Sequence, residues 1–225
     1  MTKHLEREVD RLKRKILNLS SIVEDSLFKA VRSVEKRDRT LAESVIKMDH
    51  EIDSIEVEVE EDCLKILALH QPVAIDLRLI IAALKINNDL ERIGDLAVNI
   101  ADRAVSLSQL KPVKEELPFE EMAHGVRQML RKSLQALVHL DVQQAQEVCA
   151  SDDRIDEFNK QIHKQVLESM RHNPEDVQSL MLFISVSRNL ERVADHATNI
   201  AEDVIYMVDG EIVRHRVAEL CQAPV

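Results

Sequence analysis

The sequence DLERIGDLAVNIADR, residues 89–103, returns 100 positions later as NLERVADHATNIAED, residues 189–203. Both copies contain Leu-Glu-Arg, then an Asp four positions after the Glu, then Asn-Ile-Ala. Residues four apart on a helix share one face, so Glu91 and Asp95 point the same way, as do Glu191 and Asp195. The chain therefore contains an internal repeat built on a helix with paired carboxylates.

The rest of the chain has the composition of an all-helical protein. Of its 225 residues 45% are apolar but only 2% aromatic, and there are three Gly and five Pro. Strands favour aromatic residues and their turns favour Gly, so we expect no sheet. Apolar residues at helical spacing predict six long helices. We place these near residues 4–36, 39–69, 74–109, 119–139, 142–171 and 175–208.

The segment KPVKEELP, residues 111–118, divides these helices into three and three. Its two prolines end helices on both sides. Short loops make consecutive helices antiparallel neighbours. The predicted fold is therefore two tandem antiparallel three-helix bundles related by internal duplication. Residues 1–110 form the first bundle, 111–118 the linker, 119–210 the second bundle and 211–225 a C-terminal tail.

Charge and cysteine content exclude several classes of function. The net charge of −11 opposes binding to nucleic acid, which needs a basic face. Cys63, Cys149 and Cys221 lack zinc-site or disulfide-framework spacing, so we expect reduced thiols in the cytosol. The charged N-terminal segment predicts no secretory signal. The longest apolar run, residues 79–84, is too short to cross a bilayer.

The second and fifth helices carry further carboxylate pairs, Asp49 with Asp53 and Asp152 with Asp156. Residues of two antiparallel helices lie level when they are equally far from the turn, and the first turn centres on Pro72. The turn at residues 173–174 gives the second hairpin the same register. The predicted level pairs are Asp49 with Asp95, Asp53 with Glu91, Asp152 with Asp195, and Asp156 with Glu191.

Four level carboxylates in each bundle repel one another, so we expect a cation to offset the repulsion. Oxygen ligands at this density suit iron, manganese, zinc or magnesium, and several ions could be bridged at once. We therefore predict one multinuclear metal site per bundle. Candidate further ligands are Asn99, Asn199, Asp102, Glu202, Glu56 and His196. The alternative is a solvated acidic face paired with Lys or Arg, and Arg92 and Arg192 are expected to form structural ion pairs.

No motif for catalysis is present. The chain has no His-Glu-x-x-His, no Gly-x-Ser-x-Gly and no Gly-rich phosphate loop. His50, His70, His163 and His172 are scattered, and we expect them to be surface or turn residues. The sequence therefore favours a protein that is not an enzyme.

The repeats, the paired carboxylates and two longer stretches identify a family. QPVAIDLRLIIAALKINNDLERIGDLAVNIA (residues 71–101) and SLMLFISVSRNLERVADHATNIAEDVIYMVDG (residues 179–210) closely resemble the PhoU family of phosphate-specific transport system accessory proteins. The resemblance covers nearly the whole chain. It implies a cytoplasmic, usually dimeric negative regulator of the phosphate-starvation regulon, which reaches the membrane only through its partners.

The resemblance also implies partners and ligands. The partners would be the ATPase subunit of the phosphate ABC transporter and a membrane sensor histidine kinase. Carried over position by position, the ligands of the metal clusters would be Asp49, Asp53, Glu91, Asp95, Asp152, Asp156, Glu191 and Asp195. The repeat is uneven where Glu56 and Glu60 correspond to Asn159 and His163, so the two sites need not hold the same ions.

Two other functions are weighed against this one. A carboxylate-bridged metalloenzyme of the ferritin-like kind would need Glu-x-x-His, but Gly94 and Ala194 stand where the His would be. A metal-free helical scaffold would use its acidic faces only to recognise basic partner surfaces.

Overall fold

The computed structural model describes residues 3–113 and 117–210. Within these residues the chain forms six long α-helices and no strand, as the composition predicts. The helices are α1 (Lys3–Lys36), α2 (Arg39–His70), α3 (Ile75–Ser108), α4 (Phe119–His139), α5 (Val142–His172) and α6 (Val177–Asp209). The predicted tail, residues 211–225, and Cys221 within it lie outside the described residues.

Equivalent capping residues begin the second helix of each repeat. Asp38 accepts a hydrogen bond from the backbone N–H of Leu41 at 3.0 Å, and Asp141 accepts one from Gln144 at 3.0 Å. These carboxylates satisfy N–H groups that the first turn of a helix leaves without partners. The residue before each cap has positive φ, 53° at Arg37 and 51° at Leu140. The same short connection therefore joins α1 to α2 and α4 to α5.

The start of α3 and of α6 differs slightly from the prediction. Ala74 has a φ of 50°, which a right-handed helix excludes, so α3 begins at Ile75. Pro174 opens a short 3₁₀ helix, Pro174–Asp176, and α6 follows it directly. Proline suits this position because its fixed φ is helical and it has no N–H to leave unpaired.

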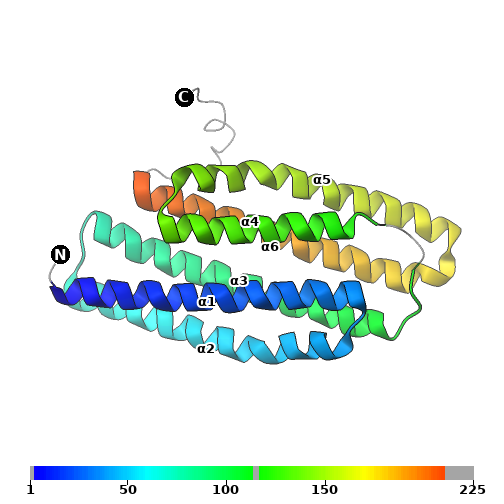
Figure 1. Ribbon diagram of the computed structural model, residues 1–225, viewed down its shortest axis with the longest axis horizontal. Coiled ribbons are helices and arrows are strands. Elements are labelled where there is room, and N and C mark those ends of the chain that lie inside the picture. The colour runs from blue at the N-terminus through cyan, green and yellow to red at the C-terminus, as the bar shows by residue number, and fades with distance from the viewer. Residues whose placement is uncertain (1–2, 114–116, 211–225) are drawn as a thin grey trace, which may run out of the picture.

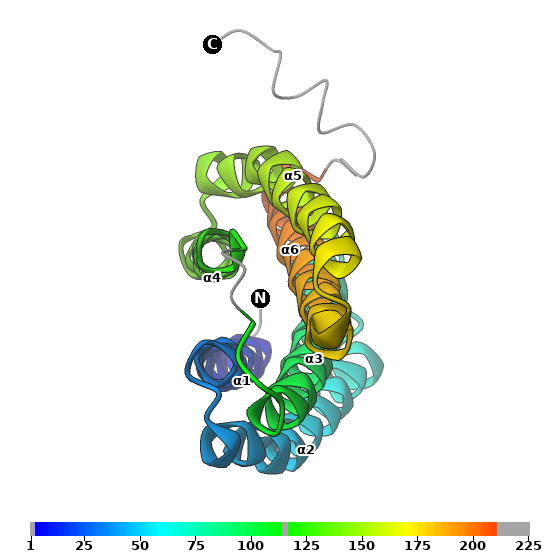
Figure 2. The ribbon, with the colours of Figure 1, turned by 90° about the vertical axis from the view of Figure 1, so that its right-hand side faces the viewer.

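The six helices form two layers (Figures 1 and 2). Seen from the end, α5, α6, α3 and α2 follow one another in a curved layer, and α1 and α4 lie side by side on one side of it (Figure 2). Each bundle contributes its first helix to the small layer and its other two to the curved layer. The repeats meet where α3 packs against α6 and α1 against α4.

The core follows the apolar stripes expected from the sequence. In α2 the buried row includes Val45, Ile52, Val59 and Ile66. In α3 the buried row includes Ile86, Leu90, Ile93, Ala97, Ile100 and Ala104. Cys63 and Cys149 are free and buried, and burial raises the pKa of the Cys63 thiol to about 12. That thiol is therefore protonated and unreactive at neutral pH.

Polar pairs join α3 to α6 at related positions in the two repeats. Lys85 Nζ donates to Asp203 Oδ1 at 2.9 Å, and Arg103 Nε donates to Ser185 Oγ at 3.1 Å. Position 85 corresponds to 185 in the repeat, and 103 to 203, so the two contacts are related by an approximate two-fold axis. One is an ion pair and the other a bond to a neutral hydroxyl.

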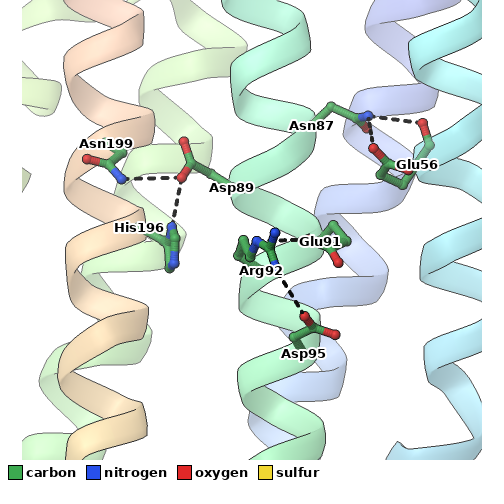
Figure 3. A network of polar contacts seen from close by, with 8 residues as sticks. All are labelled: Glu56, Asn87, Asp89, Glu91, Arg92, Asp95, His196 and Asn199. Carbon is green, nitrogen blue, oxygen red and sulfur yellow. Dashed lines mark hydrogen bonds and ion pairs between the residues drawn. The ribbon is translucent and has the colours of Figure 1, made fainter.

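Between these contacts, the buried carboxylate of Asp89 on α3 accepts bonds from α6. His196 Nδ1 lies 2.7 Å from Asp89 Oδ1, and Asn199 Nδ2 donates to the same oxygen at 3.3 Å (Figure 3). The polar residues of the interface therefore fix how the two bundles dock.

No helix in the part of the chain that the structure describes is long and apolar enough to cross a membrane.

Candidate metal-binding site

The first cluster of carboxylates lies between α2 and α3. Burial raises the pKa of Asp49, and the charges of Asp53 and Asp95 raise it further. Burial likewise raises the pKa of Glu91, helped by Asp95 on its own helix and by Glu56 and Asp53 on α2, and opposed by Arg92. Side chains on α2 and α3 therefore act on one another in the register counted from the turn.

The second cluster repeats this arrangement between α5 and α6. Burial raises the pKa of Asp152 to about 6, and Asp195 across the helix pair and Asp156 on the same helix add to the shift. The pKa values of Glu191 and Asp195 are raised as well, by burial first and then by neighbouring carboxylates. Thr198 Oγ1 donates to Asp152 Oδ1 at 3.4 Å. The eight residues predicted as ligands therefore fall into two groups of four, one in each bundle, whose charges act on one another.

The oxygen atoms of the clusters suit a hard or borderline cation. Asp49 Oδ1 is buried and has no hydrogen-bond partner among the described residues. A carboxylate oxygen in that state is costly unless a cation or a proton satisfies it. The raised pKa values of the neighbouring carboxyls show that their charged forms, too, are unfavourable without a nearby positive charge. The donor set therefore fits a divalent metal, and metal ligation by these residues stays a prediction.

The clusters are more open than a closed coordination shell. In no cluster of the eight predicted residues do three ligand atoms lie within 4.8 Å of one another in the described structure. Arg92 on α3 accounts for part of the charge balance. Its Nε lies 3.5 Å from Glu91 Oε2 and its Nη1 lies 3.5 Å from Asp95 Oδ2 (Figure 3). This is the structural ion pair expected of Arg92, and half of its side chain stays exposed.

Beside each cluster lies a position at which the two repeats have different residues. In the first, Asn87 Nδ2 donates to the backbone oxygen of Glu56 at 3.0 Å and lies 3.4 Å from its Oε1 (Figure 3). In the second, Ser187 Oγ donates to Asn159 Oδ1 at 2.7 Å. Position 87 corresponds to 187, and 56 to 159, so one repeat has a carboxylate where the other has an amide. The two clusters therefore differ in charge.

Two of the candidate further ligands have other partners. His196 and Asn199 bond to Asp89 at the interface of the bundles, so both take part in docking, and His196 also acts on the charge of Asp195 in the second cluster. Sequence reasoning missed Asp89, although a signal was present. Asp89 lies between the buried Ile86 and Ile93 in the buried row of α3. A carboxylate in that row requires a partner from another helix.

The expectation that His70 is an isolated turn residue was also incomplete. His70 ends α2 and meets His4 and Glu8 of α1 at that end of the molecule. These three are the one group of His, Cys, Asp or Glu in the described residues whose ligand atoms all lie within 4.8 Å of one another. The signal was the spacing of His4 and Glu8, four apart on one helix face.

A duplicated helical bundle with four carboxylates between two helices of each half defines the class of helical protein to which this chain belongs, and comparison with known proteins identifies the family. The model of the PhoU domain matches residues 16–104 and again residues 119–204. The chain belongs to the PhoU family.

Its similarity to curated members spans almost their full length. It is 38% identical to the phosphate-specific transport system accessory protein PhoU homolog 1 of Thermotoga maritima, over 92% of this chain and 90% of that protein. It is 37% identical to the PhoU homolog of Aquifex aeolicus, over 93% and 95%. The crystal structure of PhoU from Pseudomonas aeruginosa matches with a TM-score of 0.86 and 34% identity, over 92% of this chain and 99% of that one.

Proposed function

We propose that this chain is a cytoplasmic accessory protein of a phosphate transport system and a negative regulator of the phosphate-starvation regulon. Its partners are the transporter's ATPase subunit and a membrane sensor histidine kinase, and it acts as a homodimer without catalysing a reaction. The names of the relatives, which are accessory proteins of phosphate-specific transport, support the role in transport. The paired carboxylate clusters support a regulator that responds to metal ions.

The observation that carries the metal-binding part is the buried Asp49 Oδ1, which has no hydrogen-bond partner among the described residues and belongs to a set of four carboxylates at matching positions of the hairpin. Iron, manganese, zinc or magnesium would be held by Asp49, Asp53, Glu91 and Asp95 in one bundle and by Asp152, Asp156, Glu191 and Asp195 in the other. A bound divalent ion supplies the positive charge that these groups lack. It would also link α2 to α3 and α5 to α6, and so stiffen the surface that a partner meets.

A metal assay tests the clusters directly. Protein purified without a tag or chelator should contain more than one equivalent of metal by plasma mass spectrometry. In the quadruple variant with Asp49, Asp53, Asp152 and Asp156 changed to Asn, the metal content should fall to at most one equivalent while the protein remains helical by circular dichroism. A control variant changes exposed acidic residues of the same helices to their amides: Glu51, Glu61, Asp153 and Glu157. Equal metal content in both variants would contradict the proposal.

A reporter of the starvation regulon tests the regulatory role. In cells that lack this protein, the reporter should stay active in high phosphate, and the intact gene should restore repression. Repression by the quadruple cluster variant, expressed at the same level, would show that regulation does not need the clusters. Failure of the intact gene to repress would overturn the proposed function itself.

Arg92 gives specific support to a second candidate, a metal-free scaffold whose acidic faces bind basic partner surfaces. Its contacts with Glu91 and Asp95 show that a side chain can balance part of the charge. This scaffold should bind the purified ATPase subunit equally well before and after chelation. A loss of affinity on chelation would instead favour the metal-dependent regulator.

A further inference from the structure

We propose that His4, Glu8 and His70 form a mononuclear site for a zinc-class divalent transition metal. The site is separate from the carboxylate clusters and goes beyond the proposed function. His70 lies 17 residues after Asp53 on the same helix, which corresponds to about 25 Å along the axis. One ion cannot serve both places.

The distances between the side chains fit a cation between them. Glu8 Oε1 lies 3.8 Å from His4 Nε2, and Glu8 Oε2 lies 3.7 Å from His70 Nε2. Both distances exceed a hydrogen bond. Zinc bonds of about 2.1 Å in tetrahedral geometry place neighbouring ligand atoms about 3.4 Å apart. The ligand atoms of all three residues lie within 4.8 Å of one another, so movements of about 1 Å bring them to this tetrahedral spacing.

His70 Nε2 is a buried nitrogen that requires a partner. The His70 side chain is only 14% exposed, and within the described residues its Nε2 makes no hydrogen bond. The ring of His4 meets that of His70 edge to face, with ring centroids 5.3 Å apart. This packing holds both imidazoles beside the same carboxylate. A metal ion would satisfy the buried nitrogen and the charge of Glu8 together.

The chemistry of the donors selects the class of metal. Two imidazoles and one carboxylate are ligands for zinc and its neighbours in the first transition series. Magnesium and calcium prefer oxygen ligands only. His4 is 72% exposed, so solvent can reach the ion and water can fill the fourth position. The site is therefore a three-ligand site open to solvent.

The helices that carry the ligands are firmly placed. Leu5 and Val9 beside the α1 ligands are buried, and Ile66 anchors the last turn of α2. That turn closes with the N–H of Gln71 donating to Leu67 O at 3.2 Å. Binding would therefore clamp the first turns of α1 to the end of α2 and add its free energy to the stability of the first bundle.

Cobalt(II) titration of the full-length, untagged protein after chelation tests the site. The quadruple cluster variant is the starting protein, so that the carboxylate clusters do not contribute. One equivalent of Co²⁺ should bind and give the strong visible absorption of a four-coordinate ion, and Zn²⁺ should displace it. Affinity should fall by roughly tenfold or more when either His4 or His70 is changed to Gln.

His172→Gln is the matched control, because His172 ends α5 as His70 ends α2 but lies in the second bundle. It should leave Co²⁺ binding unchanged. Circular dichroism shows whether each variant is folded, and Glu8→Gln provides a third, independent ligand substitution. Unchanged Co²⁺ affinity in folded His4→Gln and His70→Gln proteins would overturn the site, as would no binding by the starting protein at millimolar Co²⁺. Neither result bears on the carboxylate clusters.

Discussion

Asp152 shows at the scale of one residue how the fold places a charge where it is unfavourable. Its folded pKa of about 6 lies above its ordinary value of 3.8, because of burial and then the charges of Asp195 and Asp156. The folded protein therefore binds this proton more tightly than the unfolded chain does. The contribution of Asp152 to the free energy of unfolding is therefore greatest below about pH 4 and falls as the pH rises through 6.

Asp152→Asn should consequently stabilise the metal-free protein at pH 7.5. The Asn keeps an oxygen that can accept from Thr198, and it removes the charge. Because the side chain is only half-buried, solvent screening limits the gain to about 1 kcal/mol. Urea unfolding in the presence of EDTA measures it, and the gain should disappear near pH 4. The exposed Glu157→Gln is the control, and an Asp152→Asn protein no more stable than wild type at pH 7.5 contradicts the prediction.

At the scale of the helices, the same capping residue begins α2 and α5. Replacing Asp38 or Asp141 with Ala should each cost about 1 kcal/mol of unfolding free energy, because a backbone N–H loses its acceptor. The losses should add in the double variant, since the two caps belong to different bundles. Urea unfolding measures both. Asn at either position accepts the same bond and should retain most of the stability; an equal loss with Asn would show that capping is not the cause.

The sequence could predict the helices and the level carboxylates because both depend on distances along a single hairpin. Periodic apolar residues place each helix, and the position of Pro72 sets the register of Asp49 against Asp95. The contact of His196 depends on how the two bundles pack, because His196 reaches across to the other bundle. His70 and His4 lie equally far from the turn at Arg37, so the same count could have paired them. Periodicity indicates which face is buried but not which partner buries it.

At the scale of the whole molecule, the pair of Asp89 and His196 couples the two bundles. His196→Leu should cost about 2 kcal/mol of unfolding free energy, because it leaves a buried carboxylate with one long bond to Asn199. Adding Asp89→Asn to His196→Leu should recover part of this loss. Urea unfolding of the two single variants and the double variant measures the coupling. Simple addition of the two single effects would argue against the pair.

The uneven contacts across the approximate two-fold axis mean that the halves are no longer interchangeable. Two copies of the first half would set Lys85 of each opposite Arg103 of the other, so cations would repel where an ion pair now forms. Each Asp89 would then face the apolar Leu96 instead of His196. Two copies of the second half would set Ser185 opposite Asp203. Each half has thus become a specific partner for the other, as in a heterodimer whose subunits share one chain.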